Sequence, residues 1–185
     1  GLEGLKLEGE RRKVTIMETD IRGFTSLSEK KQPEEIVTLI NIYLDKQTEV
    51  IKNHGGDIDK FVGDAVLAIF IGKDMADNAV DCAIDIQNEI IKLNKKLDGD
   101  TMIGIGINTG PVVRGPVGSK DRMDYTVIGD NVNLACRLCD AANPGEIIIS
   151  EKTQKYLSQN RFNLIKQDSL QLKGMEKPVI NYRVE

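Results

Sequence analysis

The order of structural patterns within about the first 110 residues constrains the fold more than any other feature of this sequence. Two long helical patterns, at 33–53 and 75–97, alternate with short runs rich in valine, isoleucine and other aliphatic residues. The first helical pattern begins at Pro33 and ends before a Gly-Gly pair, which frames a helix. The resulting order, β-α-β-β-α-β, is typical of the ferredoxin-like split βαβ arrangement. We therefore predict an α+β fold with helices on one face of a mainly antiparallel sheet.

The extended runs predict the strands of this sheet. We expect a first strand at Val14–Asp20 and a tight hairpin from Ile58–Val62 and Ala65–Phe70, since two residues separate those runs. The segment Thr101–Gly118 alternates apolar residues with glycine and polar residues, which predicts a strand, a turn near Gly110-Pro111 and a returning strand. Further elements are expected as follows: strands at Tyr125–Ile128 and Glu146–Ser150, a helix at Asn131–Ala142, and small additional strands and helices toward the C-terminus.

The 185 residues suffice for one ordinary domain with a single hydrophobic core. Residues 1–12 are mixed and charged, and we interpret them as the end of an upstream connector, leaving residues 13–185 as the domain. The chain starts without methionine, so we expect a longer parent protein with a regulatory domain upstream.

Composition excludes several function classes. Acidic residues exceed basic ones, 29 to 25, which gives no general attraction for a nucleic-acid backbone, so we expect no nucleic-acid partner. Three cysteines, an odd number, favour a reducing and hence cytoplasmic setting. With a single histidine, a tetrahedral zinc site at Cys136 and Cys139 is hard to assemble. No apolar run is long enough to span a bilayer, although the parent protein could still be membrane-anchored.

Two aspartates are candidates for metal binding. Asp20 ends the first predicted strand, and Asp64 lies in the predicted hairpin between the second and third strands. The first and third strands are neighbours in a split βαβ fold, so these carboxylates can converge on one point. Hard oxygen ligands suit Mg²⁺ or Mn²⁺, and a pair of such ions assists in-line displacement at phosphorus. Alternatively, each Asp is only a turn residue.

A candidate phosphate-binding segment follows Asp20. In the string IRGFTS, a glycine and then two hydroxyl residues stand where a helix begins, so free backbone N–H groups can face a phosphate chain. An ordinary helix cap made by Thr25 or Ser26 is the simpler alternative.

A second group of polar residues lies further along the chain. Asn133 and Arg137 are four positions apart and therefore share one helix face. A guanidinium fork matches phosphate oxygens, and an amide can hold a ribose hydroxyl. Lys173 could reach terminal phosphates as a point charge. The alternative for all three residues is a solvated surface.

The strings TDIRGFTSLSE, DKFVGDAVLAIF and DYTVIGDNVNLACRL, in this order and spacing, closely resemble the class III adenylyl/guanylyl cyclase catalytic domain. The resemblance covers about Glu10 to Glu185. It implies a nucleotide cyclase at 13–185 that acts as a head-to-tail homodimer. Two nucleotide sites would be shared at its interface, and each would hold two Mg²⁺ or Mn²⁺ ions.

The resemblance also implies roles for individual residues. They are Asp20, Asp64 and the backbone of Ile21 for metal; Gly23, Phe24, Thr25 and Lys173 for phosphates; Lys60 and Thr126 for the base; Asn133 for the ribose; and Arg137 for the transition state. Family members often carry one more phosphate-binding Arg, at the position of Asp121 here. We prefer Arg122 for that role, with Lys120 as the other candidate.

The two base positions favour ATP as the substrate. An ammonium at position 60 can only donate a hydrogen bond and adenine N1 accepts one, whereas Thr126 can accept from the adenine amino group. GTP-specific members resemble Glu at the first position and Cys or Ser at the second. We therefore expect an adenylate cyclase that releases pyrophosphate. The alternatives are a guanylate cyclase and a catalytically silent, nucleotide-binding regulatory domain.

Overall fold

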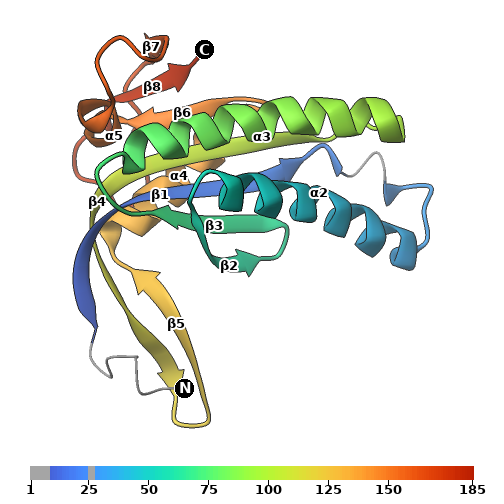
Figure 1. Ribbon diagram of the computed structural model, residues 1–185, viewed down its shortest axis with the longest axis horizontal. Helices are drawn as coiled ribbons and strands as arrows, with labels where there is room; N and C mark the ends of the chain where they lie inside the picture. Colours follow the sequence, from blue (N-terminus) through green and yellow to red (C-terminus); the bar gives the residue numbers. More distant parts are fainter. Residues whose placement is uncertain (1–8, 25–27) are drawn as a thin grey trace.

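The computed structural model describes residues 9–24 and 28–185. Within that part of the chain, an eight-stranded sheet has the order β2-β3-β1-β4-β6-β8-β7, with β5 paired to β4 (Figure 1). The elements run in the order β1 (Glu10–Arg22), α2 (Pro33–Asn53), β2 (Asp57–Val62), β3 (Ala65–Phe70), α3 (Met75–Leu97), β4 (Met102–Ser119), β5 (Arg122–Ile128), α4 (Asp130–Ala141), β6 (Ile147–Ser150), α5 (Glu151–Tyr156), β7 (Leu164–Lys166) and β8 (Asn181–Val184).

The first six elements, β1 to β4, form the predicted split βαβ core. β1 pairs antiparallel with both β3 and β4, and β2 pairs with β3. The two core helices begin and end where the sequence predicts. In α2, acidic residues in the first turn and Lys52 in the last complement the helix dipole. The α+β prediction is confirmed.

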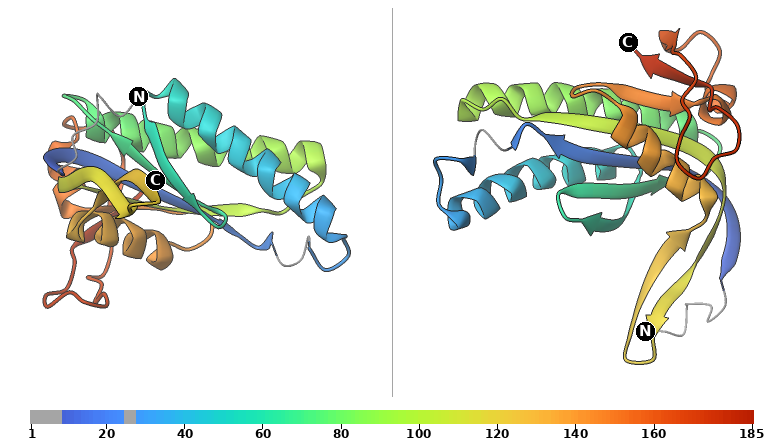
Figure 2. Two further views of the ribbon diagram at one scale, coloured as in Figure 1. Left: turned by 90° about the horizontal axis from the view of Figure 1, so that it is seen from below. Right: turned by 180° about the vertical axis from the view of Figure 1, so that it is seen from behind.

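Both faces of the sheet are covered, and the two faces carry different helices. On β1, Met17 and Ile21 belong to the hydrophobic cluster that includes most of the buried apolar residues of α2 and α3. Val14 and Ile16, which point to the opposite face, pack instead with Val132 of α4. Seen from behind, α4 lies across the face of the sheet away from α2 and α3 (Figure 2). The prediction of helices on one face is thus right for α2 and α3 and wrong for α4.

The predicted turn near Gly110-Pro111 is wrong, because β4 runs through it as one strand. Gly110 pairs with Val14 and Pro111 with Lys13. On its other edge, β4 pairs with β6 up to Ile107 and with β5 from Val113 onward. Pro111 lies between these stretches, where its missing N–H costs no bond to either strand. The chain turns at 120–121 instead, so β4 and β5 project as a two-stranded arm, residues 113–128 (Figure 1).

β1 begins at Glu10, which pairs with Arg114, so residues 10–12 of the segment interpreted as a connector belong to the sheet. Among the described residues, the helices are all too short or too polar to cross a bilayer.

Candidate active site

Asp20 and Asp64 lie at the same end of two neighbouring strands. The ladder between β1 and β3 reaches Thr19, which pairs with Val66. Asp20 follows Thr19 directly, and Asp64 stands two residues before Val66 in the turn that joins β2 to β3. Both side chains are half-buried. The strand adjacency on which the metal-site prediction depends is therefore present.

Arg22 anchors Asp20. Its Nε donates to Asp20 Oδ1 at 2.6 Å, and its two terminal nitrogens donate to the carbonyl oxygens of Ala142 (2.8 Å) and Cys139 (2.6 Å) at the C-terminal end of α4. One guanidinium thus ties the end of β1 to the end of α4. Arg22 was not among the predicted site residues, although residues two apart on a strand share a face.

The surroundings of Asp20 are acidic. Burial raises the pKa of Glu18 above its usual value, a hydrogen bond with Cys136 lowers it, and the charges of Asp140 and Asp20 raise it further. The net shift is upward. These carboxylates therefore lie close enough to repel one another, and the negative potential they create favours a cation.

β1 continues two residues past Asp20 and ends at Arg22. The Ile21 side chain is buried in the core, which fixes the backbone of that residue at the sheet end. Gly23 has φ +74°, a conformation that other residues rarely adopt. Phe24 packs against the core cluster, whereas Thr25, the third predicted phosphate contact, lies outside the described residues.

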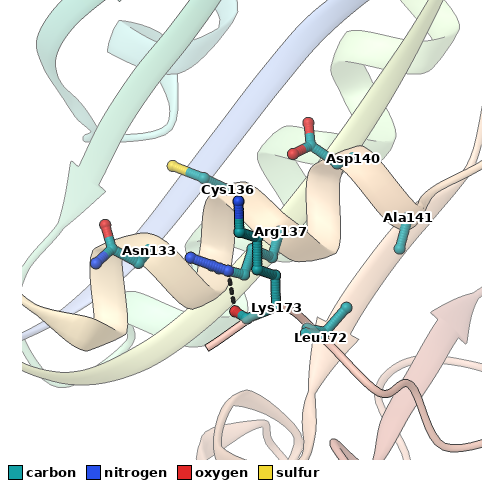
Figure 3. A pocket seen from close by; sticks show the side chains of 7 residues that line it. All are labelled: Asn133, Cys136, Arg137, Asp140, Ala141, Leu172 and Lys173. Atoms are coloured by element: carbon teal, nitrogen blue, oxygen red, sulfur yellow. Dashed lines mark hydrogen bonds between the residues drawn. The ribbon is translucent and has the colours of Figure 1, made fainter. Parts of the chain in front are cut away.

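Three predicted residues line one cavity of about 570 Å³ beside α4 (Figure 3). They are Asn133, Arg137 and Lys173, and the other lining residues are Cys136, Asp140, Ala141 and Leu172. Arg137 and Asn133 extend from the outer side of α4, and Arg137 Nη1 donates to the carbonyl oxygen of Lys173. The structure therefore brings the predicted ribose, transition-state and triphosphate residues together.

The position of α4 depends on Gly106 of β4. A Cβ atom at Gly106 would lie 2.2 Å from Cys139 N and 2.4 Å from Ala135 O, so only glycine permits this close approach of helix to sheet. Leu134 and Leu138 of α4 are buried as well. The helix face that carries Arg137 is therefore held on a rigid support.

The two predicted base residues line a second cavity, of about 420 Å³, between β2 and β5. Its lining residues are Asp59, Lys60, Phe61, Val117, Asp124, Tyr125 and Thr126. Lys60 is exposed, whereas Thr126 is 6% exposed and its hydroxyl donates to Asp59 Oδ2 at 2.5 Å. Asp59 was not predicted from sequence.

The two cavities are electrostatic neighbours. Burial raises the pKa of Cys136, which lines the first cavity, to about 12, and the positive charge of Lys60 in the second cavity opposes that rise. The charge of Lys60 in the second cavity therefore acts on a residue of the first cavity, so the two cavities lie near each other.

Arg122 does not line either cavity. It is exposed at the first position of β5, opposite Ser119, at the tip of the arm. Lys120 lies in the turn next to it. The role of the additional phosphate-binding cation stays a prediction.

A family model described as "Adenylate and Guanylate cyclase catalytic domain" matches residues 8–185. This chain belongs to that family. The adenylate cyclase of Anabaena cylindrica is 36% identical over 198 residues, covering 100% of this chain and 39% of that relative. The cyclase domain thus spans less than half the length of this relative.

Two solved structures resemble the cyclase domain closely. The adenylyl cyclase CyaB from P. aeruginosa has a TM-score of 0.91 at 37% identity, covering 97% of this chain and 96% of that chain. The guanylyl cyclase Cya2 has a TM-score of 0.88 at 39% identity, covering 95% of this chain and 93% of that chain. Overall similarity therefore does not separate ATP from GTP, and the base must be argued from the residues of the second cavity.

Proposed function

We propose that this cyclase domain is an adenylate cyclase that converts ATP to 3′,5′-cyclic AMP and pyrophosphate. The observation that carries the proposal is the second cavity, which Lys60 and Thr126 line together. The Lys60 ammonium donates to adenine N1, and the Thr126 oxygen accepts from the adenine amino group. In guanine, N1 carries a hydrogen, so a donor would face the Lys60 ammonium, which is itself a donor.

The first cavity supplies the groups for the reaction. The ribose 3′-hydroxyl loses its proton to water as its oxygen attacks the α-phosphorus, so the O3′–P bond forms and the bond from that phosphorus to the leaving pyrophosphate breaks. Asn133 holds the ribose in position, and Arg137 meets the negative charge that develops at phosphorus. Lys173 contacts the triphosphate as a point charge. Gly23, Phe24 and Thr25 bind phosphates through backbone N–H groups, with Arg122 as an additional contact from the arm.

Asp20, Asp64 and the backbone carbonyl of Ile21 would hold two Mg²⁺ or Mn²⁺ ions. The donor set fits, because carboxylate and carbonyl oxygens are the ligands that these ions prefer and the carboxylates around Asp20 give a negative potential. When bound, the ions would lower the proton affinity of the 3′-hydroxyl and neutralise phosphate charge. Arg22 keeps Asp20 oriented from the α4 side.

A homodimer with two shared sites is the assembly we propose. In the resembling family, the carboxylates and the Asn-Arg pair of one site come from different subunits. Large apolar side chains on β2 and on the arm support such an interface: Phe61, Val62, Val117, Met123 and Ile128 are 43–55% exposed. Apolar surface of this kind is typical of a protein–protein interface.

A longer, cytoplasmic parent protein with an upstream regulatory domain completes the proposal, since the chain spans only 39% of the Anabaena relative.

A guanylate cyclase is the second candidate, favoured by the 39% identity to Cya2. Incubating the purified chain with ATP or GTP, in Mg²⁺ or Mn²⁺, and identifying the cyclic product separates the two candidates. We expect cyclic AMP and a higher kcat/KM for ATP. Faster turnover of GTP at equal concentration would refute the adenine assignment, and no cyclic product from either nucleotide would refute catalysis.

A further inference from the structure

β2 contains an irregularity at Asp59 that places this residue in the second cavity. Ile58 pairs with Ala68 and Lys60 pairs with Leu67, so Asp59 is an extra residue opposite the regular β3 ladder. In a regular strand, neighbouring side chains point to opposite faces, whereas a bulge redirects them. Accordingly, the adjacent residues Asp59 and Lys60 both line the second cavity.

Asp59 controls the hydrogen of the Thr126 hydroxyl. Thr126 Oγ1 donates to Asp59 Oδ2 at 2.5 Å, and Thr126 is 6% exposed. A hydroxyl has a single hydrogen and an ionised carboxylate can only accept, so the bond to Asp59 uses the one donor that Thr126 has. The oxygen of Thr126 can then only accept from a ligand.

We propose that Asp59 is a specificity-determining positioning residue that makes Thr126 an acceptor-only group toward position 6 of the purine. This inference rests on the proposed function of the same cavity. A 6-amino group, as in adenine, donates to Thr126. A 6-oxo group, as in guanine or hypoxanthine, can only accept, so it meets an oxygen with no hydrogen to offer. Asp59 acts through Thr126 and does not need to touch the nucleotide.

The test compares the affinities of ATP and inosine triphosphate, which carry a 6-amino and a 6-oxo group. Dissociation constants come from displacement of a fluorescent ATP analogue, so the measurement does not require turnover. In Asp59→Ala the freed hydroxyl can donate to a 6-oxo group, and the preference for ATP over inosine triphosphate falls about tenfold, the size of one hydrogen bond. In Asp59→Asn most of the preference remains, because the amide oxygen can still accept from Thr126.

Two controls separate this role from a general loss of charge or fold. Asp57→Ala removes a carboxylate from the same strand, at a side chain that is 63% exposed, and should keep the wild-type preference. In a Thr126→Val background, Asp59→Ala should change the preference no further, because the group through which it acts is gone. Thermal unfolding of each variant verifies the fold.

The inference is overturned if folded Asp59→Ala keeps the wild-type preference, or weakens both nucleotides equally. It is also overturned if Asp59→Ala has its full effect without the Thr126 hydroxyl. Failure of the proposed function is a different result: the wild-type chain forms no cyclic AMP from ATP.

Discussion

The two halves of the candidate site are built differently. Asn133 and Arg137 stand on a helix packed tightly against the sheet at Gly106, and together with Lys173 they line a cavity that one chain forms by itself. Asp20 instead lies in β1 just past its ladder with β3, and Asp64 lies in the two-residue turn between β2 and β3. Recognition of ribose and base needs concave surfaces with fixed donors and acceptors. Binding of a cation needs mainly converging negative charge.

Arg22 links the halves directly within one chain, since it bonds both Asp20 and the last carbonyls of α4. A small shift of α4 would therefore move the Arg22 guanidinium and alter its bond to Asp20.

The largest expected effect comes from removing a carboxylate charge. Asp20→Asn or Asp64→Asn should reduce cyclic AMP formation by at least about a hundredfold, because in the proposed function each residue would help to hold the ions that activate the hydroxyl. The fold should persist, since both side chains lie at the margin of the core. Product formation at saturating metal is the measurement, with circular dichroism to verify folding. Activity above about a tenth of wild type would count against the metal assignment.

A smaller effect is expected from substitutions in the second cavity, which Lys60 and Thr126 line. Lys60→Glu with Thr126→Cys should lower the preference for ATP over GTP by about ten- to a hundredfold, because a carboxylate accepts from guanine N1–H and faces adenine N1 without a proton. The measurement is the ratio of kcat/KM values. Relaxed selectivity is expected rather than a complete switch, since Asp59 remains in the cavity beside position 126 and can accept the hydrogen of the cysteine thiol. An unchanged ratio of the kcat/KM values for ATP and GTP would indicate that other residues select the base.

The smallest effect on activity should come from a carboxylate outside both halves. Asp77 accepts from the Ser158 backbone N–H at 2.9 Å and pairs with Arg161 at 3.2 Å. Burial raises its pKa, but the bonds from Ser158 and Arg161 outweigh this and lower it overall. Asp77→Asn should therefore cost about 1–3 kcal/mol of unfolding free energy at neutral pH with little change in kcat.

The stability that Asp77 contributes should decrease in acid. Because the folded pKa of Asp77 is below its unfolded value, its contribution is present above the unfolded pKa and is lost as pH falls through the folded pKa. Urea unfolding of wild type and Asp77→Asn at pH 7 and about pH 3 should show the difference shrinking in acid. A difference that grows in acid would contradict this account.

Much of the fold followed from local signals. The helices at 33–53 and 75–97 were predicted with their observed ends, because periodicity and Pro33 act locally. The turn at Gly110-Pro111 was predicted wrongly for the same reason. Whether a proline breaks a strand depends on which neighbours need its N–H, and those neighbours, β5 and β6, are set by tertiary pairing.

The site shows a similar division. Resemblance to the family pointed to Arg137 and Lys60, which the cavities contain. Asp59 was missed because a bulge depends on register against β3, which strand propensity does not reveal. The anchoring role of Arg22 was missed because one of its partners, Ala142, is 120 positions away.

The measurement that tests the shared-site account most directly is complementation between the two halves. An Asp20→Asn chain and an Arg137→Ala chain, each inactive alone, are mixed under conditions where subunit exchange is shown by fluorescence transfer. Each heterodimer then has one site with neither substitution, and an equal mixture should recover roughly a quarter of wild-type cyclic AMP formation. Mixing Asp20→Asn with Asp64→Asn, both in the carboxylate half, should recover none. An inactive first mixture despite exchange, or equal recovery in both mixtures, would contradict a site built from the two halves of different chains.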